Sequence, residues 1–133
     1  MIFGVGTDIV ELSRIQETFN RFGEHFVERL LMDEERELFE RNKWPVRFLA
    51  MRFAAKEATV KAMGTGFAHG MWIRDVGIIN NDWGRPEVIW SERGQGVCKR
   101  LGIGAGHVSL SDDVGLVIAF AMVEHAISNN KKL

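Results

Sequence analysis

The segment Pro45–Met63 constrains the fold of this chain more than any other part of the sequence. Proline is well suited to the first turn of a helix because its missing N–H group would have no partner there. Glycine commonly ends a helix, and Gly64-Thr65-Gly66 follows Met63 directly. The spacing therefore predicts that this segment is the longest helix of the protein.

Apolar periodicity and turn residues predict the other elements. Asp33 and Ser91 are well placed to act as helix N-caps. Further helices are expected over residues 11–22, 25–31, 33–42 and 91–101. Strands are expected over residues 2–5, 76–80, 87–90, 107–111 and 116–123. The second and third strands suit a hairpin and the last, a continuous apolar run, suits the centre of a sheet. This order predicts an α+β fold, with one long helix and several others packed on a mostly antiparallel sheet.

Size and composition restrict the organisation of the chain. A length of 133 residues with 46% apolar residues is enough for one core and too little for two ordinary domains, so residues 1–133 are expected to form a single domain with a frayed tail at 128–133. A net charge of -1 argues against binding nucleic acid or anionic lipid through overall charge. Cys98 is the only cysteine, which excludes an intrachain disulfide. The amino terminus has neither a basic leader nor a long apolar stretch, which points to the cytoplasm.

Glu57 is the first candidate for chemistry. At about 100° per residue it projects into the middle of an apolar stripe of the long helix, with Lys61 at the edge of the stripe. The stripe consists of Val46, Leu49, Phe53, Val60 and Gly64. A carboxylate on the core-facing side needs a cation, a metal or hydrogen bonds to compensate its burial. The alternative is an ordinary Glu57–Lys61 pair on a solvated face, which contributes about 0.2–0.5 kcal/mol.

Asp8 is the second candidate, because it follows a short apolar strand where that strand gives way to a helix. Sites in proteins of this kind gather at such strand ends, although a helix cap explains an aspartate there equally well. Two carboxylates, together with phosphate oxygens and water, are the usual ligands of Mg²⁺. Asp8 and Glu57 therefore form a candidate metal pair.

Three blocks of sequence, in order along nearly the whole chain, carry a family resemblance. They are Gly6-Thr7-Asp8-Ile9-Val10-Glu11, then Arg52-Phe53-Ala54-Ala55-Lys56-Glu57-Ala58 with Lys61-Ala62 and Gly64-Thr65-Gly66, then His107-Val108-Ser109-Leu110-Ser111. Together they resemble the holo-[acyl-carrier-protein] synthases, the small bacterial type of 4′-phosphopantetheinyl transferase. The resemblance implies a homotrimer that binds coenzyme A between neighbouring subunits. It also implies transfer of 4′-phosphopantetheine to a serine of apo acyl carrier protein, which yields 3′,5′-ADP and supports fatty acid biosynthesis.

The resemblance also assigns roles to residues of this chain. Asp8 and Glu57 would bind Mg²⁺, and Lys61 would contact the phosphates, so these three form the expected catalytic set. The remaining positions around coenzyme A and its phosphates would be Arg52, Gly64, Gly66, Arg85, Pro86, His107 and Ser109. Such residues make chemical sense, because attack by a serine hydroxyl on the β-phosphate builds negative charge on oxygen atoms. Glu57 and a metal-bound water are both candidates for accepting the proton.

Arg14 and Arg21 match the docking helix of the family. They lie seven residues apart and hence on the same side of a helix, where arginines would meet carboxylates of the acidic carrier protein. The alternative for both is plain solvated surface. Two other functions remain open: a Mg²⁺-dependent enzyme acting on a different nucleotide or coenzyme A ester, and a non-catalytic oligomer that binds acidic partners.

Overall fold

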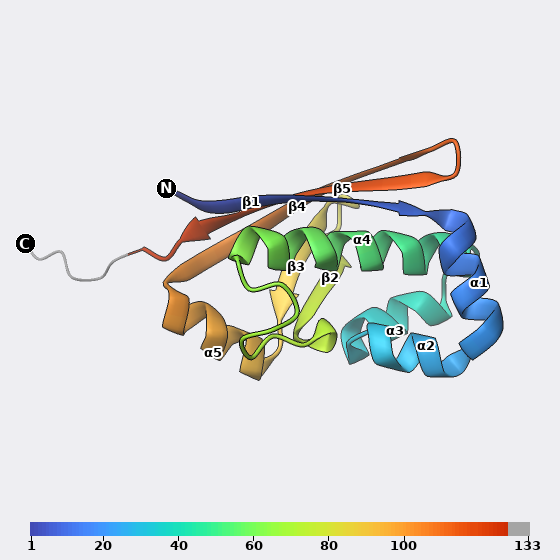
Figure 1. Ribbon diagram of the computed structural model, residues 1–133, viewed down its shortest axis with the longest axis horizontal. Helices are drawn as coiled ribbons and strands as arrows, with labels where there is room; N and C mark the ends of the chain where they lie inside the picture. Colours follow the sequence, from blue (N-terminus) through green and yellow to red (C-terminus); the bar gives the residue numbers. More distant parts are fainter. Residues whose placement is uncertain (128–133) are drawn as a thin grey trace, which may run out of the picture.

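The computed structural model of the protein describes residues 1–127, and the predicted frayed tail lies outside them. Five antiparallel strands form one sheet in the order β1-β5-β4-β3-β2. The strands are β1 (Ile2–Glu11), β2 (Val76–Asn80), β3 (Pro86–Trp90), β4 (Ile103–Asp113) and β5 (Leu116–His125). The helices are α1 (Leu12–Phe22), α2 (Glu24–Leu30), α3 (Asp33–Glu40), α4 (Pro45–Met63) and α5 (Glu92–Leu101), with a short 3₁₀ turn, η1 (Ile73–Asp75). The predicted α+β fold is confirmed (Figure 1).

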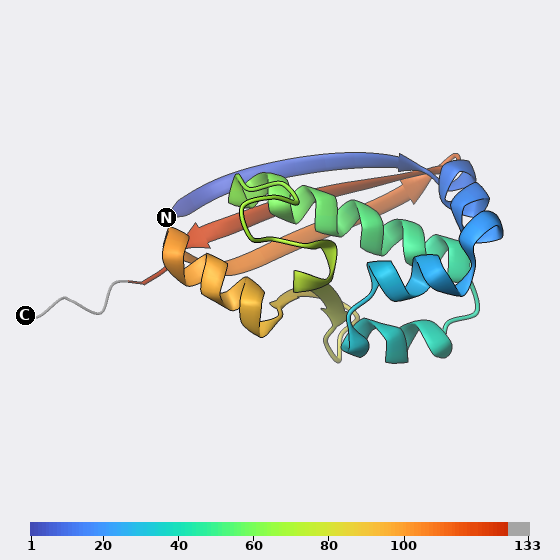
Figure 2. The same ribbon diagram turned by 60° about the horizontal axis from the view of Figure 1, so that its bottom comes forward.

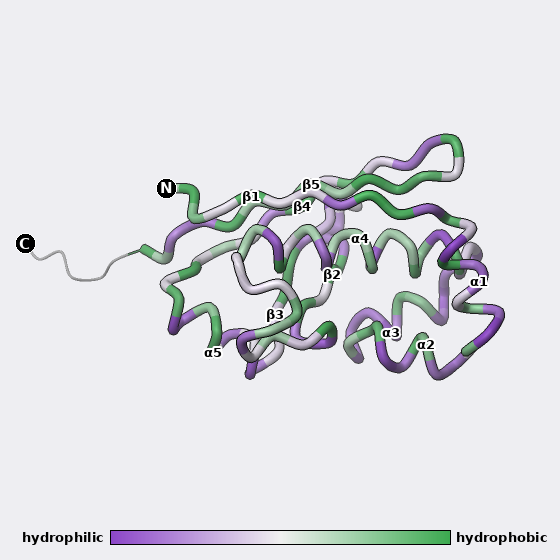
Figure 3. Tube along the Cα trace, in the orientation of Figure 1, coloured by the Kyte–Doolittle hydropathy of each residue, from purple (hydrophilic) through white to green (hydrophobic). Residues whose placement is uncertain are grey.

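The helices gather on one side of the long strands, and α4 runs along β1 and β5 (Figures 1 and 2). Gly4 and Gly6 make this packing possible, because a Cβ atom at either position would overlap the carbonyl oxygen of Ala62 or Ala58 in α4. Alternate side chains of β5 are buried under the helices, and the side chains between them are exposed or half-buried. The opposite face of the sheet is therefore open. Apolar positions lie along β1 and β5 in Figure 3.

Local signals located several elements correctly. Helix α4 has the predicted bounds, and Gly64 ends it in the left-handed conformation with φ of 80°. The hydroxyl of Ser91 accepts a hydrogen bond from Gly94 N and caps α5, as predicted. Strands β2 and β3 form the predicted hairpin, and Cys98 is buried.

Other predictions about the elements were wrong. Strand β1 continues to Glu11 because it pairs with β5 along its length, so Asp8 lies inside the strand and not after it. Asp33 is the first residue of α3, and the N-cap position belongs to Met32. The apolar strand β5 lies between β1 and β4, one place from the edge, and β4 occupies the centre.

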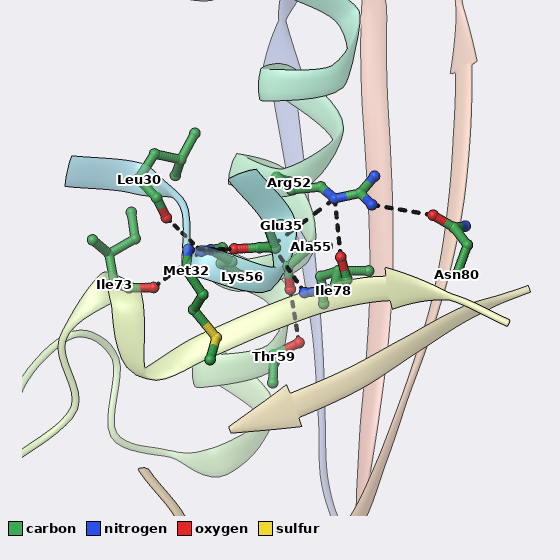
Figure 4. A network of polar contacts seen from close by, with 10 residues as sticks. All are labelled: Leu30, Met32, Glu35, Arg52, Ala55, Lys56, Thr59, Ile73, Ile78 and Asn80. Carbon is green, nitrogen blue, oxygen red and sulfur yellow. Dashed lines mark hydrogen bonds and ion pairs between the residues drawn. The ribbon is translucent and has the colours of Figure 1, made fainter. Parts of the chain in front are cut away.

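A buried ion pair joins the helices beneath the sheet (Figure 4). Lys56 Nζ of α4 lies 2.6 Å from Glu35 Oε1 of α3, and neither side chain has any exposed surface. The ammonium group also donates to the carbonyl oxygens of Leu30 and, at 3.3 Å, of Ile73. Burial lowers the pKa of Lys56, and the charge of Glu35 opposes that shift. All three ammonium protons thus have acceptors, as a buried charge requires.

Hydrogen bonds from backbone N–H groups to both carboxylate oxygens of Glu35 extend the network. Glu35 Oε1 accepts from Met32 N at 2.9 Å, and Oε2 accepts from Ile78 N of β2 at 2.8 Å. Arg52 donates through Nε to the carbonyl oxygen of the same Ile78 at 3.1 Å and lies 3.9 Å from Glu35 Oε2. The network therefore connects α3 and α4 to β2.

No helix within residues 1–127 has both the length and the apolarity needed to cross a membrane.

We predict that Glu35→Ala lowers the free energy of unfolding by about 3–5 kcal/mol, because it leaves the Lys56 charge buried without its counter-ion. Urea unfolding measures the change. Glu37→Ala, on the exposed side of the same helix, serves as the control and should stay within about 0.5 kcal/mol of the unsubstituted protein. Equal effects of the two substitutions would show that the buried pair does not stabilise the fold.

Candidate functional site

A cleft of about 580 Å³ opens between β1, α1 and α4, and we call it the carboxylate cleft. Its lining includes Asp8, Glu57 and Arg14. Asp8 lies opposite Ala119 of β5 in the strand register, and Ala119 is fully buried under the helices. Because directly paired residues of an antiparallel sheet share a face, the Asp8 side chain points toward α4.

The structure corrects the predicted orientation of Glu57. This residue is partly buried, and it lies with Phe53 and Lys61 along the least buried edge of α4. Leu49 and Val60 point into the core, as expected, but the ionisable side chains buried beside them are Arg52 and Lys56. Helix α4 is covered on nearly all sides, so apolar neighbours do not mark a single core-facing stripe.

Electrostatic contacts link the two carboxylates and Lys61. Lys61 Nζ lies 3.2 Å from Asp8 Oδ1 and donates to the carbonyl oxygen of Thr7 at 3.0 Å. The pKa of Glu57 is raised, mainly by burial and further by the negative charge of Asp8, while Lys61 opposes the shift. Asp8 and Glu57 are thus close enough to repel each other, and a divalent cation between them would relieve the repulsion.

The donor set of the cleft fits Mg²⁺ as a shared ion. Two carboxylates from separate elements supply hard oxygen ligands, which Mg²⁺ prefers. Within residues 1–127 no group of three or more histidine, cysteine, aspartate or glutamate side chains could hold a metal. Asp8 and Glu57 would therefore hold the ion in part, with phosphate and water oxygens completing its coordination.

A second cleft, of about 640 Å³, lies where the β2–β3 hairpin diverges from β4, and we call it the arginine cleft. Arg47, Arg52 and Arg85 all line it, together with Pro86 and Ser109. Strands β3 and β4 pair only at Glu87 and His107, which leaves the space between them open. Three guanidinium groups around one cleft suit an anion such as a phosphate.

The other predicted binding residues, His107, Gly64 and Gly66, line neither of these two clefts. His107 lines a hollow of about 380 Å³ beside Arg85 and Pro86, and its Nε2 atom lies 2.6 Å from Glu124 Oε2. Gly64 and Gly66 follow α4 at its far end, where both have positive φ. The carboxylate cleft and the arginine cleft have no lining residue in common. The structure thus brings Asp8, Glu57 and Lys61 together, but it separates them from Arg52, Arg85, Pro86 and Ser109.

Arg14 of α1 borders the carboxylate cleft, and Arg21 lies farther along the same helix. Both are exposed; Arg14 lines the cleft, and the Arg21 guanidinium lies 5.2 Å from the centre of the Phe22 ring. An apolar hollow between α1 and α2 adjoins the cleft, because Thr18 and Phe26 line both. A macromolecule bound along α1 would therefore reach the carboxylates.

Arg47 and Asn80 are among the polar residues of the arginine cleft that sequence reasoning missed. Arg47 forms two hydrogen bonds of 2.9 Å to the Asp112 carboxylate, and this pairing raises the pKa of Arg47 and lowers that of Asp112. Asn80, at the end of β2, accepts a hydrogen bond from Arg52 at 3.1 Å. Neither stands in a recognisable motif, although an arginine in the first turn of the longest helix could have suggested Arg47.

Comparison with known proteins gives consistent matches over most of the chain. The family model of the 4′-phosphopantetheinyl transferase superfamily matches residues 4–121. The holo-[acyl-carrier-protein] synthase of Hamiltonella defensa is 40% identical over 123 residues, which cover 92% of this chain and 98% of that protein. The crystal structure of the synthase from Neisseria meningitidis has a TM-score of 0.89 at 40% identity and covers 93% of this chain and 99% of that one. The structure from Bacillus anthracis, solved in complex with CoA (3′,5′-ADP), has a TM-score of 0.77 at 33% identity and covers 95% and 99%.

We predict that Glu57→Gln stabilises the metal-free protein at neutral pH. The pKa of Glu57 is raised in the folded protein, so folding disfavours the ionised carboxylate. The stability that the protonated carboxyl group contributes is therefore lost as the pH rises from the ordinary pKa of 4.5 through the raised pKa. Glutamine cannot ionise and avoids this loss. Thermal unfolding in EDTA between pH 4 and pH 8 should therefore show a gap between the two proteins that grows with pH.

The same variant should lose the response to magnesium. Mg²⁺ at a hundred times its Kd would stabilise the unsubstituted protein by about 2.7 kcal/mol at pH 8. The exposed Glu17→Gln on α1 is the matched control and should keep that gain. An undiminished magnesium response in Glu57→Gln would rule out Glu57 as a ligand.

Proposed function

The chain belongs to the 4′-phosphopantetheinyl transferase superfamily, and from that membership we propose its reaction and its site. The protein is a holo-[acyl-carrier-protein] synthase: it transfers 4′-phosphopantetheine from coenzyme A to a serine of apo acyl carrier protein, in support of fatty acid biosynthesis. The observation that carries the site assignment is the meeting of Asp8 and Glu57 at one cleft bordered by α1, with Lys61 in contact with Asp8. The same proposal places the protein in the cytoplasm, with its coenzyme A.

The chemistry requires stabilised negative charge and an aligned nucleophile. The serine Oγ forms a bond to the β-phosphorus while the P–O bond to the α-phosphate breaks, and 3′,5′-ADP leaves with the bonding electrons. Asp8 and Glu57 would hold Mg²⁺, which would supply charge stabilisation for the diphosphate oxygens. Lys61 adds a positive charge beside Asp8, and the Glu57 carboxylate can take the serine proton.

Coenzyme A is proposed to span two subunits. The arginine cleft, with Arg52, Arg85, Pro86 and Ser109, suits its phosphates, and His107 lies in the adjoining hollow. Gly64 and Gly66 would let the ligand approach the backbone after α4 closely. A neighbouring copy is proposed to supply the second half, because the two clefts of one chain share no lining residue. The complex of the Bacillus anthracis relative with CoA (3′,5′-ADP) supports this choice of ligand.

An open apolar sheet face supports assembly as a homotrimer. Four side chains of β1 and β5 on this face are between 45% and 59% exposed. They are Val5, Ile9, Ile118 and Phe120. An exposed apolar patch of this kind commonly marks a protein interface. Burying it between copies would also place the β4 residues His107 and Ser109, which belong to the same sheet, beside a neighbouring subunit.

The acidic carrier protein is proposed to dock on α1 through Arg14 and Arg21. Both arginines are exposed, and Arg14 reaches the cleft that holds Asp8 and Glu57. The apolar hollow next to α1 offers a contact for apolar side chains of a helical partner. Charge pairs at the rim of such an interface chiefly increase the rate of association.

Intact-mass spectrometry tests the reaction directly. Incubation with apo acyl carrier protein, coenzyme A and Mg²⁺ should add one phosphopantetheinyl group to the carrier, and EDTA should prevent it. Asp8→Asn should lower kcat/KM by roughly a thousandfold, because it removes a charge that holds the metal at the reacting phosphate. Glu17→Gln should transfer normally.

Two results would contradict this assignment. Hydrolysis of coenzyme A without any mass increase of the carrier would indicate a different magnesium-dependent enzyme. Full transfer by the double variant Asp8→Asn, Glu57→Gln in EDTA would eliminate the metal pair.

Light scattering after size-exclusion chromatography tests the assembly. Phe120→Glu should convert a trimer into monomers, because it puts a charge at the apolar contact, and transfer activity should fall with the loss of the shared site. Trp83→Glu, at the exposed turn between β2 and β3, should leave the mass of the assembly unchanged. A monomeric unsubstituted protein with full activity would refute the shared site.

A further inference from the structure

The turn between β2 and β3 carries Arg85 into the arginine cleft, although very little packing holds it. Trp83 and Arg85 are exposed, and Gly84 adopts a φ of 82°. Within the turn, Asn81 Oδ1 accepts hydrogen bonds from Trp83 N at 2.9 Å and Arg85 N at 3.0 Å. These bonds shape the turn internally. They do not fix its position relative to α4, the opposite wall of the cleft.

One side chain joins the turn to α4. Asn80 Oδ1 accepts from Arg52 Nη2 at 3.1 Å, and Asn80 Nδ2 donates to the carbonyl oxygen of Gly84 at 3.1 Å. An arginine can only donate and a carbonyl oxygen can only accept, so the partners determine the orientation of the amide. Asn80 thus bridges a guanidinium of α4 and the backbone one residue before Arg85.

Arg52 is a rigid support for this bridge (Figure 4). Its side chain is buried, with 7% of the residue exposed. Its guanidinium carbon lies 4.1 Å from the centre of the Phe48 ring, and its Nε atom donates to the carbonyl oxygen of Ile78. Glu35 accepts a hydrogen bond from the N–H group of the same Ile78, so both charged side chains hydrogen-bond to the backbone of one residue of β2. The buried network therefore extends to the edge of the cleft.

From this chain of contacts we propose that Asn80 is a positioning residue for coenzyme A, because it couples the buried Glu35–Arg52 network to the turn that presents Arg85. The proposal rests on the function above, in which the arginine cleft binds the phosphates of coenzyme A. A positively charged side chain on a preorganised turn binds an anion with less loss of conformational freedom than one on a free turn. Without the bridge, the turn keeps its internal bonds but loses its fixed distance to Arg52.

Calorimetric titration of coenzyme A into the folded, unliganded protein tests the proposal. Asn80→Ala should raise the Kd for coenzyme A about tenfold, a change expected for the loss of a bridging side chain with two hydrogen bonds. In the transfer assay the KM for coenzyme A should rise similarly, while kcat and the KM for the carrier protein stay unchanged. Because Asn80 is exposed, the thermal unfolding midpoint should change little. Asn20→Ala, an exposed asparagine on α1, should leave the Kd for coenzyme A unaltered.

A double-variant cycle with Arg85 separates positioning from direct contact. If Asn80 acts by holding Arg85 in place, Asn80→Ala should cost little more affinity once Arg85→Ala is present. Additive losses would show that Asn80 contributes independently of Arg85 and would overturn the proposal, as would an unchanged Kd in Asn80→Ala. If the unsubstituted protein transfers phosphopantetheine, these outcomes refute the role of Asn80 alone. If it does not bind coenzyme A at all, the proposed function fails and this inference fails with it.

Discussion

The buried contact between Lys56 and Glu35 sets the rotation of α4 about its axis, and both clefts depend on that rotation. Successive residues of a helix project about 100° apart. Once Lys56 points to Glu35 in α3, Glu57 must point to another side, toward β1 and the carboxylate cleft. Arg52, about one turn earlier, then lies against β2 and the arginine cleft. A single buried ion pair therefore orients the residues of two separate clefts.

The distance between α4 and β1 is the second constraint on the site. Gly4 and Gly6 let the backbone of β1 lie against the carbonyl oxygens of Ala58 and Ala62. Asp8, two residues beyond Gly6 on the same face of the strand, consequently lies within reach of Lys61. The repulsion between Asp8 and Glu57 costs free energy in the metal-free fold, and this cost is tolerated because the remainder of α4 is well buried.

Local chemistry in the sequence was sufficient to predict elements with strong start and stop signals, such as α4 with its proline and glycines or α5 with Ser91. It could not predict the length of β1, because pairing with β5 carries that strand through Thr7 and Asp8. Nor could it separate Glu35 from the other acids of α3, since its role depends on Lys56, which is 21 residues away in sequence. The pairing of Asp8 with Glu57 was predicted from residue chemistry and family resemblance together, whereas the separation of the two clefts required coordinates.

The distribution of charge explains how a chain with a net charge of -1 can serve two anionic partners. Arg47, Arg52 and Arg85 concentrate positive charge in one cleft, and Arg14 and Arg21 place it along α1. Some of the balancing acids pair directly with these arginines, as Asp112 does with Arg47, and several others are exposed on α3. Exposed charges beyond about 8 Å are largely screened at physiological salt, so each basic surface acts locally and the overall charge has little influence on either. Under the proposed function, electrostatic selection of the nucleotide by the arginine cleft and of the carrier protein by α1 can therefore be adjusted independently.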